Sequence, residues 1–436
     1  MKVSVLELIE SDYPAITPEA AAKEALRLAD DIVKTPFSKD PSFMSGSPGT
    51  AVFLCAALRY KNESGAAADD RSYIEQVLTH LEESLANGIL TDLSLASGLC
   101  GTIHALILLS RIGCPGDLSY LLNLALDRLS AASPSGLACT DYYLGTAGIV
   151  SVLCEIIEYL DSSLHLATGA FLNSATDGPL HSATNGSSHS VTDASLRPAL
   201  HKMLLTAMEQ LLSRQSIPID GRMLWDLMYT QKPISGLGHG MFGIGAALLR
   251  GARILEKVPG LVPKDRIERF RRAGLDAFGF ELDSYRPDLT EWPDLRPNGS
   301  PLRSLHGICS GAPGIGMGLL ALHDEPLMKE NKVLPERAHD SCLRAALRKN
   351  DHLCCGKASL AEYFLTRYAY TGEHADYLTA GRILSYMNDE RLRGGSGQYS
   401  FPAAIPAADT SLFFGSAGPG YEYLRYALPA LPPVLP

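Results

Sequence analysis

The chain has 436 residues, of which 46% are hydrophobic and 20% are charged, so its composition is that of a folded globular protein and not of a disordered one. The formal net charge is -10 and the lysines and arginines form no block, which argues against nucleic acid as a partner. No apolar run reaches the roughly 18 residues of a membrane-spanning helix, and acidic residues interrupt the apolar start of the chain, unlike in a signal peptide. We therefore expect a cytoplasmic protein without a membrane span.

One element recurs seven times along the chain: a turn of small residues, usually Gly-x-x-Gly, that leads into an apolar stretch. The first copy reads SGSPGTAVFLCAAL and the last FGSAGPGYEYLRYAL. Each stretch is apolar on nearly all sides, which is typical of a helix that is buried all round. We predict seven inner helices, which follow the leading glycines Gly46, Gly98, Gly145, Gly240, Gly311, Gly356 and Gly415.

A charged, amphipathic helix is predicted before each of these turns. The first, at 18–34, has Thr17 in the N-cap position and Pro18 at the first helical position. Its apolar residues recur on one face, as in a helix that packs on a core. The other outer helices are expected at 71–87, 117–131, 194–213, 264–279, 335–350 and 373–391.

Alternating outer and inner helices are compatible with an open solenoid or with a closed ring. The inner helices of a solenoid would line a partly wet concave surface and carry polar residues there, which these stretches nearly lack. We therefore predict an all-α fold, an α/α toroid of seven inner and seven outer helices, built by residues 1–436 as a single domain. The seven turns would share one rim, where glycines permit positive φ and close approach of backbones.

Two segments interrupt the regular spacing. The stretch near 161–193 is rich in Ser, Thr and Asn and predicts a flexible surface insertion. The stretch near 280–303 holds several prolines, so it cannot form a long helix and is expected to be a loop with a short strand pair. Because this loop precedes the turn at Gly311, it is a candidate wall of a pocket.

Three cysteines occupy equivalent places just before the leading glycine on successive repeats: Cys309, Cys354 and Cys355. Thiolates are good zinc ligands, and a catalytic zinc site has three protein ligands with one open position. A vicinal cysteine pair can instead form a disulfide, but this redox alternative gives Cys309 no role. The remaining cysteines are interpreted as core-filling thiols: Cys55, Cys100, Cys114, Cys139, Cys154 and Cys342.

Two further turns carry side chains suited to proton transfer. His239 lies between two glycines, which leaves its imidazole unhindered at the start of an inner helix. Asp141 precedes the glycine of its turn by four residues. A core or capping histidine and a simple N-terminal aspartate cap are the structural alternatives. If all turns share one rim, these two residues and the three cysteines lie together.

This set of seven turns resembles the lanthionine synthetase C-like cyclases, and in particular the cyclase domain of bifunctional class II lanthipeptide synthetases. The resemblance implies an α/α toroid with a zinc ion at its centre, held by Cys309, Cys354 and Cys355 as in the subgroup with three cysteine ligands. It also implies that His239 is the acid or base and that Asp141 is its partner. The substrate would be a dehydrated precursor peptide, made by a dehydratase that is separate from this chain.

The sequence departs from the family pattern at several places. The fifth turn reads Ile308-Cys309-Ser310-Gly311, without the usual aromatic or imidazole neighbours of the cysteine. Ser359 stands where the sixth turn usually has glycine, and Pro419 is unusual in the last turn. No arginine lies at the usual distance before Cys309, and Arg303 or His306 are the candidates to replace it.

The resemblance implies a zinc-dependent addition of a peptide cysteine to dehydroalanine or dehydrobutyrine, which forms lanthionine or methyllanthionine rings. A first alternative keeps the fold and the zinc but adds glutathione or another thiol to dehydrated residues. A second is a catalytically inert scaffold that binds peptides. A toroidal glycosidase would need paired carboxylates on the rim, where the turns offer chiefly Asp141.

Overall fold

The computed structural model describes residues 3–65, 71–132, 139–167, 196–227, 232–296, 306–325, 332–394, 397–402, 404–406 and 409–436, with only the backbone at 163–167. Most of the predicted insertion near 161–193 and the end of the predicted loop, with Arg303, lie outside these residues. The described part is mostly helical, as the sequence predicts.

The seven Gly-rich turns each lead into an inner helix. These are α3 (Ser47–Ser64), α5 (Leu99–Ile112), α7 (Thr146–Ala167), α9 (Met241–Glu256), α11 (Ala312–Ala321), α14 (Lys357–Thr371) and α16 (Ala417–Ala427). The helices between them lie outside: α2 (Pro18–Ile32), α4 (Arg71–Ala86), α6 (Leu118–Ala131), α8 (Leu196–Ser213), α10 (Lys264–Ser284), α13 (Val333–Arg344) and α15 (His374–Arg393). The short helix α1 (Val5–Glu10) precedes them.

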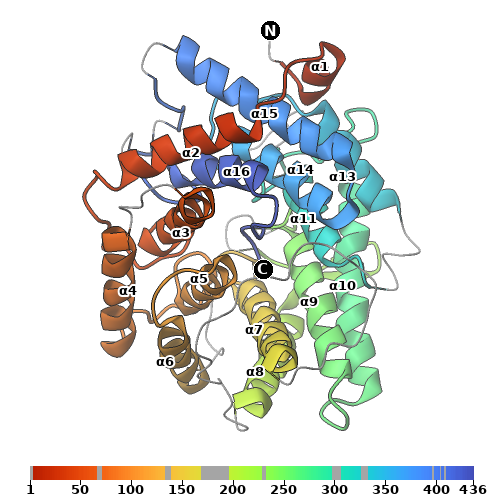
Figure 1. The fold of residues 1–436 in the computed structure, drawn as a ribbon. Coiled ribbons are helices and arrows are strands. Elements are labelled where there is room, and N and C mark those ends of the chain that lie inside the picture. The colour runs from red at the N-terminus through yellow and green to blue at the C-terminus, as the bar shows by residue number, and fades with distance from the viewer. Residues whose placement is uncertain are drawn as a thin grey trace.

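Contacts between neighbouring inner helices run around a closed ring. They follow the order α3, α5, α7, α9, α11, α14 and α16, and α16 packs back against α3. Figure 1 shows the inner helices around the centre of the molecule and the outer helices around them. The protein is therefore an α/α toroid with seven inner and seven outer helices in the described residues, as predicted.

Each outer helix packs mainly against the inner helix that precedes it in the chain, although the sequence pattern suggests a unit of one outer helix and the following turn. Thus α10 packs on α9, and α15 packs on α14. The first outer helix, α2, has no preceding inner helix and packs instead on α16, the last one. The two ends of the chain therefore meet in one pair of helices, which closes the ring (Figure 1).

Close backbone packing explains the glycines of the turns better than positive φ does. Of the seven leading glycines, all of which the structure describes, only Gly311 has a positive φ, of 107°. At Gly314, three residues further on, a Cβ atom would lie 2.0 Å from the carbonyl oxygen of Ile308. A side chain at this position would push the first turn of α11 away from the turn that precedes it.

The interior of the ring is filled by the last residues of the chain and by buried polar side chains, which the apolar pattern of the inner helices does not predict. The C-terminal residue lies near the centre of the view in Figure 1. The imidazole of His104 in α5 lies 3.0 Å from the carbonyl oxygen of Val434, and Glu362 in α14 accepts from the Val434 N–H at 3.0 Å. Arg425 in α16 pairs with Glu362 in the same buried cluster.

Some predicted element ends are wrong. The outer helix expected at 335–350 ends at Arg344, because residues 345–347 pair with the N-terminal segment through Val5 N–H to Ala345 O (3.0 Å) and Leu347 N–H to Val3 O (2.7 Å). Helix α10 extends to Ser284, so the loop expected near 280–303 begins only at Tyr285. Its expected strand pair is a single bridge between Arg286 and Glu291.

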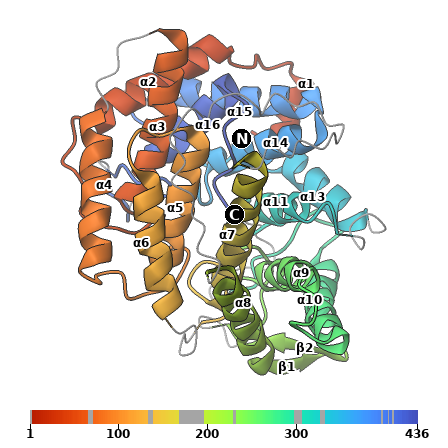
Figure 2. The same cartoon turned by 60° about the horizontal axis from the view of Figure 1, so that its bottom comes forward.

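A small antiparallel hairpin, β1 (Gln215–Ile219) and β2 (Arg222–Trp225), follows α8 and was not expected from the sequence. Its turn residues Asp220 and Gly221 have φ of 48° and 78°, the conformation that favours Asp-Gly in tight hairpins. Figure 2 shows the hairpin at the end of the molecule near α8 and α10.

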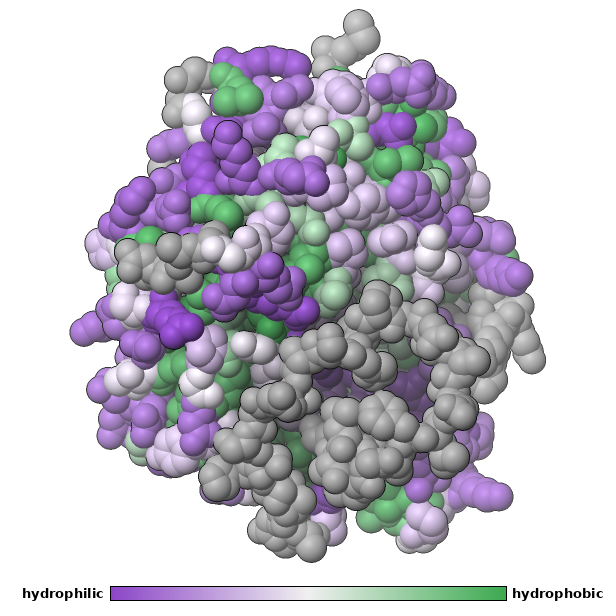
Figure 3. Space-filling view, in the orientation of Figure 1, coloured by the Kyte–Doolittle hydropathy of each residue, from purple (hydrophilic) through white to green (hydrophobic). Residues whose placement is uncertain are grey.

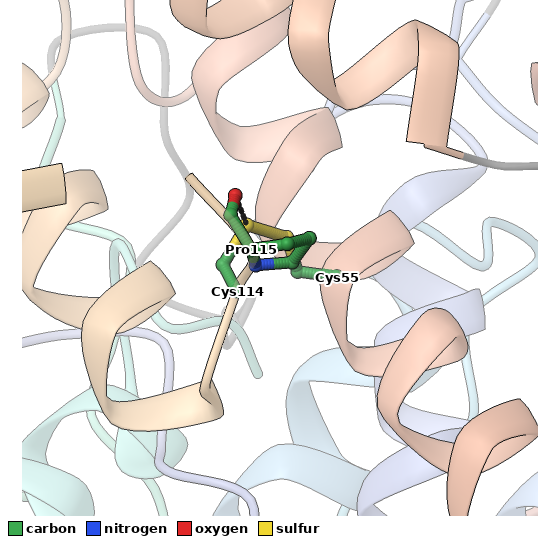
Figure 4. Close-up of a disulfide and its surroundings, with 3 residues drawn as sticks. All are labelled: Cys55, Cys114 and Pro115. Carbon is green, nitrogen blue, oxygen red and sulfur yellow. Dashed lines mark hydrogen bonds between the residues drawn. A yellow bond between two sulfur atoms is a disulfide. The ribbon is translucent and has the colours of Figure 1, made fainter. Parts of the chain in front are cut away.

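Cys55 and Cys114 form a disulfide, with their Cα atoms 5.4 Å apart. Figure 4 shows Cys55 on a helix and Cys114 beside Pro115 in a connecting segment. The interpretation of these two residues as separate core-filling thiols is therefore wrong. The αL conformation of Gly113, with φ of 84°, ends α5 and turns the chain so that Cys114 reaches α3.

Hydrophilic residues cover most of the coloured area of the face shown in Figure 3, and hydrophobic residues lie between them in smaller areas. Within the described ranges, no helix is both long and apolar enough to cross a membrane.

Candidate active site

The seven turns are joined by a closed ring of backbone hydrogen bonds. In each turn the residue two positions before the leading glycine donates its N–H to the carbonyl oxygen of the equivalent residue in the next turn, over 2.9 to 3.4 Å. The seventh turn donates to the first. The members of this ring are Met44, Ala96, Tyr143, Gly238, Cys309, Cys354 and Phe413. The turns thus share one rim, as predicted, and residues far apart in the chain meet there.

Three of the predicted site residues form a compact sulfur cluster at this rim. The sulfur atoms of Cys309, Cys354 and Cys355 lie within 4.8 Å of one another. Cys309 and Cys354 are 9% and 7% exposed, whereas Cys355 is half-buried. Tetrahedral binding at about 2.3 Å per thiolate would separate the sulfurs by roughly 3.8 Å, so small rotations would suffice. The cluster could hold a metal ion.

The electrostatics of the cluster also fit a cation. Hydrogen bonds with Cys309 and Cys354 lower the pKa of the Cys355 thiol, whereas hydrogen bonds with the other two thiols and burial raise the pKa of Cys354 well above its usual range. Only one of the three thiols therefore ionises readily. Three thiolates at this distance repel one another, so ionising all of them requires a positive charge between the sulfurs.

His352 lies beside the cluster and was not singled out from the sequence. The backbone N–H of Cys355 donates to Nδ1 of His352 at 3.4 Å. Because Nδ1 accepts this bond, the ring proton lies on Nε2, which is 3.9 Å from Sγ of Cys355. His352 is 3% exposed, so its orientation is fixed by packing. It can therefore donate to the Cys355 sulfur and position it.

The sixth turn, which carries Cys354 and Cys355, is held from inside by a fully buried lysine. Lys357 Nζ donates to the carbonyl oxygens of Arg348 (2.9 Å) and Lys349 (3.2 Å). The same ammonium group lies 2.9 Å from a carboxylate oxygen of Asp351. This lysine joins the segment before the cysteines to the start of α14.

The two residues predicted for proton transfer form a pair. Nδ1 of His239, in the fourth turn, lies 2.9 Å from Oδ2 of Asp141, in the third. Asp141 is 2% exposed, and its other oxygen accepts from the Leu144 N–H at 2.7 Å, so both of its oxygens have partners. The His239 side chain is 30% exposed. With Nδ1 donating to the carboxylate, Nε2 is the atom that can exchange a proton with another molecule.

The turn that presents His239 is fastened to the outer layer by Glu281 of α10. This carboxylate accepts from the Ser235 hydroxyl (2.5 Å) and from the backbone N–H groups of Gly236 (3.1 Å) and Phe242 (2.9 Å). It thereby caps the N-terminus of α9 from a neighbouring helix. Burial raises the pKa of Glu281 to about 7, although these three hydrogen bonds oppose the shift.

Tyr143 packs beside the histidine on the same rim. Its ring packs edge-on against His239, with 5.3 Å between ring centroids, and covers Gly238, where a Cβ would lie 2.6 Å from the ring. Burial raises the pKa of the Tyr143 hydroxyl well above its usual range, and nearby Cys354 and Cys309 raise it further. The sequence does contain a signal for Tyr143, because this residue lies two positions before the leading glycine of its turn, as Cys309 and Cys354 do.

The proline-rich loop forms a wall beside the fifth turn, as predicted. Its residues 292–296 face Ser235 and Ser310 across a small cleft. Here Arg296 makes two hydrogen bonds to buried Asp294, of 2.7 and 2.8 Å. These hydrogen bonds are the main reason why the pKa of Arg296 is raised, and the charges of Cys309 and Cys355 add to the increase. Arg296 thus lies on the wall of this cleft, beside the fifth turn.

His306, one of the two residues that the sequence suggested in place of the arginine, has its Nε2 3.2 Å from a carboxylate oxygen of Glu291 in the same loop. The hydroxyl oxygen of Ser359, in place of the usual glycine, lies within hydrogen-bond distance of two carbonyl oxygens, those of His306 (3.0 Å) and Gly356 (2.6 Å). The serine therefore joins the fifth and sixth turns. The other free cysteines, Cys100, Cys139, Cys154 and Cys342, are buried and form no disulfide.

Comparison with known proteins agrees with this architecture. A sequence model of the lanthionine synthetase C-like protein family matches residues 38–434. Among solved structures, the fold is similar to that of a nisin cyclase, with a TM-score of 0.55 and 16% sequence identity over 95% of this chain and 94% of that chain. At this identity the similarity supports the fold. No curated protein matches the sequence. Because the family match spans most of the chain, this protein belongs to the lanthionine synthetase C-like protein family.

Proposed function

We propose that this protein is a zinc-dependent peptide cyclase. It would add a cysteine thiol of a peptide to a dehydroalanine or dehydrobutyrine in the same peptide and so form a lanthionine or methyllanthionine ring. Family membership supports this reaction class. The observation that carries the proposal is the cluster of Cys309, Cys354 and Cys355 on the same rim as the His239–Asp141 pair.

The cysteine cluster supports zinc as the metal. Thiolate ligands favour zinc over magnesium or calcium, and three protein ligands leave one position for a substrate thiol. When bound, zinc lowers the pKa of this thiol, and three anionic ligands leave the resulting thiolate electron-rich. His352 would orient Cys355, and the buried Lys357 would hold the turn that carries two of the ligands.

His239 and Asp141 would manage the protons of the reaction. A bond forms between the substrate sulfur and the β-carbon of the dehydrated residue, while the electron pair of the carbon-carbon double bond moves onto the α-carbon and its carbonyl group. The α-carbon then needs a proton, and the thiol has lost one. Nε2 of His239 would accept the proton that the thiol loses and supply the proton that the α-carbon needs, while Asp141 holds Nδ1. Atoms balance without another reactant.

The substrate must already contain a dehydrated residue, so a dehydration reaction has to precede this step. We infer that a dehydrated precursor peptide is the substrate and that a separate dehydratase supplies it.

A direct test uses a synthetic peptide with one dehydroalanine and one cysteine. Zinc-loaded protein should remove the reactive thiol without changing the peptide mass, and His239→Asn should slow this by roughly 10²- to 10⁴-fold. A parallel reaction contains free glutathione and a peptide in which alanine replaces the cysteine. Glutathione adducts without ring formation in the first reaction would favour general thiol addition. If neither reaction proceeds, the proposal is wrong.

A further inference from the structure

The hydroxyl group of Tyr143 is a buried polar group without an assigned role. The side chain is 4% exposed, and its oxygen has no hydrogen-bond partner among the residues that the structure describes. A buried hydroxyl that lacks a partner loses free energy relative to water, so such groups are rare without a function. The neighbouring Tyr142 shows the usual situation, because its hydroxyl donates to Pro436 O at 2.9 Å and accepts from Ser151.

The position of Tyr143 is fixed from several sides. Its N–H donates to Gly238 O at 3.1 Å and its carbonyl oxygen accepts from Ala96, within the backbone ring of the seven turns. Its aromatic ring packs edge-on against His239 and against Phe413, with centroids 5.3 and 6.2 Å away. The aromatic ring also covers Gly238, whose N–H donates to Cys309 O at 3.0 Å. Tyr143 therefore lies beside His239 on the rim that also carries the thiols.

This inference rests on the proposed function, because the substrate atoms that would lie there are those of the dehydrated residue. Its β-carbon must approach the sulfur, and its α-carbon must approach His239. The carbonyl oxygen of the same residue gains negative charge as the carbon-sulfur bond forms, and a donor aimed at that oxygen lowers the barrier. We infer that Tyr143 is a catalytic residue whose hydroxyl donates a hydrogen bond to the carbonyl oxygen of the dehydrated residue.

Tyr143 keeps its proton throughout, and His239 still supplies the proton of the α-carbon. Its raised pKa means that the hydroxyl stays protonated and remains a donor at neutral pH. The donor strengthens as charge develops on the oxygen, so it should act on the turnover rate more than on substrate binding.

The test compares wild type, Tyr143→Phe and the matched control Tyr142→Phe, all loaded with zinc, on the peptide with one dehydroalanine and one cysteine. We expect Tyr143→Phe to lower kcat roughly 100-fold with little change in KM, as for loss of one oxyanion donor. Tyr142→Phe should keep kcat near that of wild type. Equal kcat for wild type and Tyr143→Phe would overturn the inference.

A second readout does not depend on turnover. A non-reacting peptide with serine in place of cysteine carries a ¹³C label at the dehydroalanine carbonyl, and its infrared stretch is measured on the protein. Wild type and Tyr142→Phe should lower this frequency, and Tyr143→Phe should not. If cobalt-substituted Tyr143→Phe instead differs from wild type in its thiolate charge-transfer bands and matches it in the carbonyl stretch, the hydroxyl interacts with the cysteine ligands and not with the substrate. In that case the inference fails.

The two proposals fail in different ways. If wild type does not cyclise the reactive peptide, the proposed function is wrong and the role of Tyr143 falls with it. If wild type cyclises the peptide and Tyr143→Phe matches it in kcat and in the carbonyl stretch, only the role of Tyr143 is wrong.

Discussion

The backbone N–H of Phe413 donates a 3.1 Å hydrogen bond to the carbonyl oxygen of Met44, which joins the last turn of the chain to the first. With this bond the seven turns form an unbroken ring at the rim of the toroid. Cys309 and Cys354 are members of that ring, and Cys355 and His239 each follow a member directly. The candidate site is therefore built on backbone whose hydrogen bonds are already made, which suits the precise placement of ligands.

Loss of the carboxylate of Asp141 should impair proton transfer without disturbing the metal. In Asp141→Asn the side-chain amide can still accept a hydrogen bond from the Leu144 N–H. It carries no negative charge, however, so it no longer stabilises a positive charge on His239. We expect kcat for peptide cyclisation to fall roughly 100-fold, with zinc content unchanged. Asp92→Asn is the matched control, because Asp92 accepts from the Ser94 N–H at 2.9 Å in a turn without histidine. Equal losses in both variants would mean that Asp141 only supports its turn.

Removal of the His352 imidazole should weaken metal binding. His352→Leu keeps much of the buried volume but removes the donor that lies 3.9 Å from Sγ of Cys355. Loss of such an outer partner typically costs about 10- to 100-fold in metal affinity. Competition with a chelator measures the zinc Kd, and His323→Leu, at an exposed position, should leave it unchanged. An unaltered Kd for His352→Leu would show that the imidazole does not position Cys355.

A methyl group at Gly314 should destabilise the fifth turn. The Cβ of Gly314→Ala would lie 2.0 Å from the carbonyl oxygen of Ile308, which is backbone and cannot rotate away. We expect the free energy of unfolding to fall by roughly 3 kcal/mol. Gly394→Ala is the control, since its φ is -67° and its nearest atom would lie 3.4 Å away. Denaturant unfolding measures the stability of both variants, and similar stabilities would contradict the close packing of Gly314 against Ile308.

Glu281 should make stability depend on pH near neutrality. Its pKa rises from 4.5 to about 7 on folding, so the folded state holds this proton more tightly than the unfolded chain does. Stability from this group is complete below pH 4.5 and is lost as pH rises through 7. The free energy of unfolding of wild type minus that of Glu281→Gln should fall by roughly 3 kcal/mol between pH 5 and pH 8. If the difference in unfolding free energy between wild type and Glu281→Gln stays constant from pH 5 to pH 8, the pKa of Glu281 is not raised by folding.

The repeated pattern of glycines predicts the toroid and the meeting of the cysteines, because a residue at a fixed place in each turn must lie at a fixed place on the rim. The same register would have identified Tyr143, which lies two residues before Gly145, as Cys309 does before Gly311. A tyrosine among apolar neighbours is usually a core residue, so its place in the register does not by itself indicate a function.

Other features depend on contacts that no local pattern reports. Cys55 and Cys114 are 59 residues apart and meet only because α3 and α5 are neighbours in the ring. Arg296 comes to lie beside the fifth turn from an irregular loop, where the spacing of residues predicts no position. In the sequence His104 and Glu362 are isolated polar residues within apolar helices. In the structure both form hydrogen bonds with Val434 of the C-terminal segment, which lies inside the ring.

The most direct test of the account is the zinc content of the purified protein after reconstitution under reducing conditions. Wild type and the control Cys342→Ala, which loses a buried thiol outside the rim, should each hold close to one zinc ion per chain. Cys309→Ala and Cys355→Ala should lose most of it. If wild type holds no zinc, or if the two rim variants retain it, the cysteine cluster is not the metal site and the proposed chemistry is wrong.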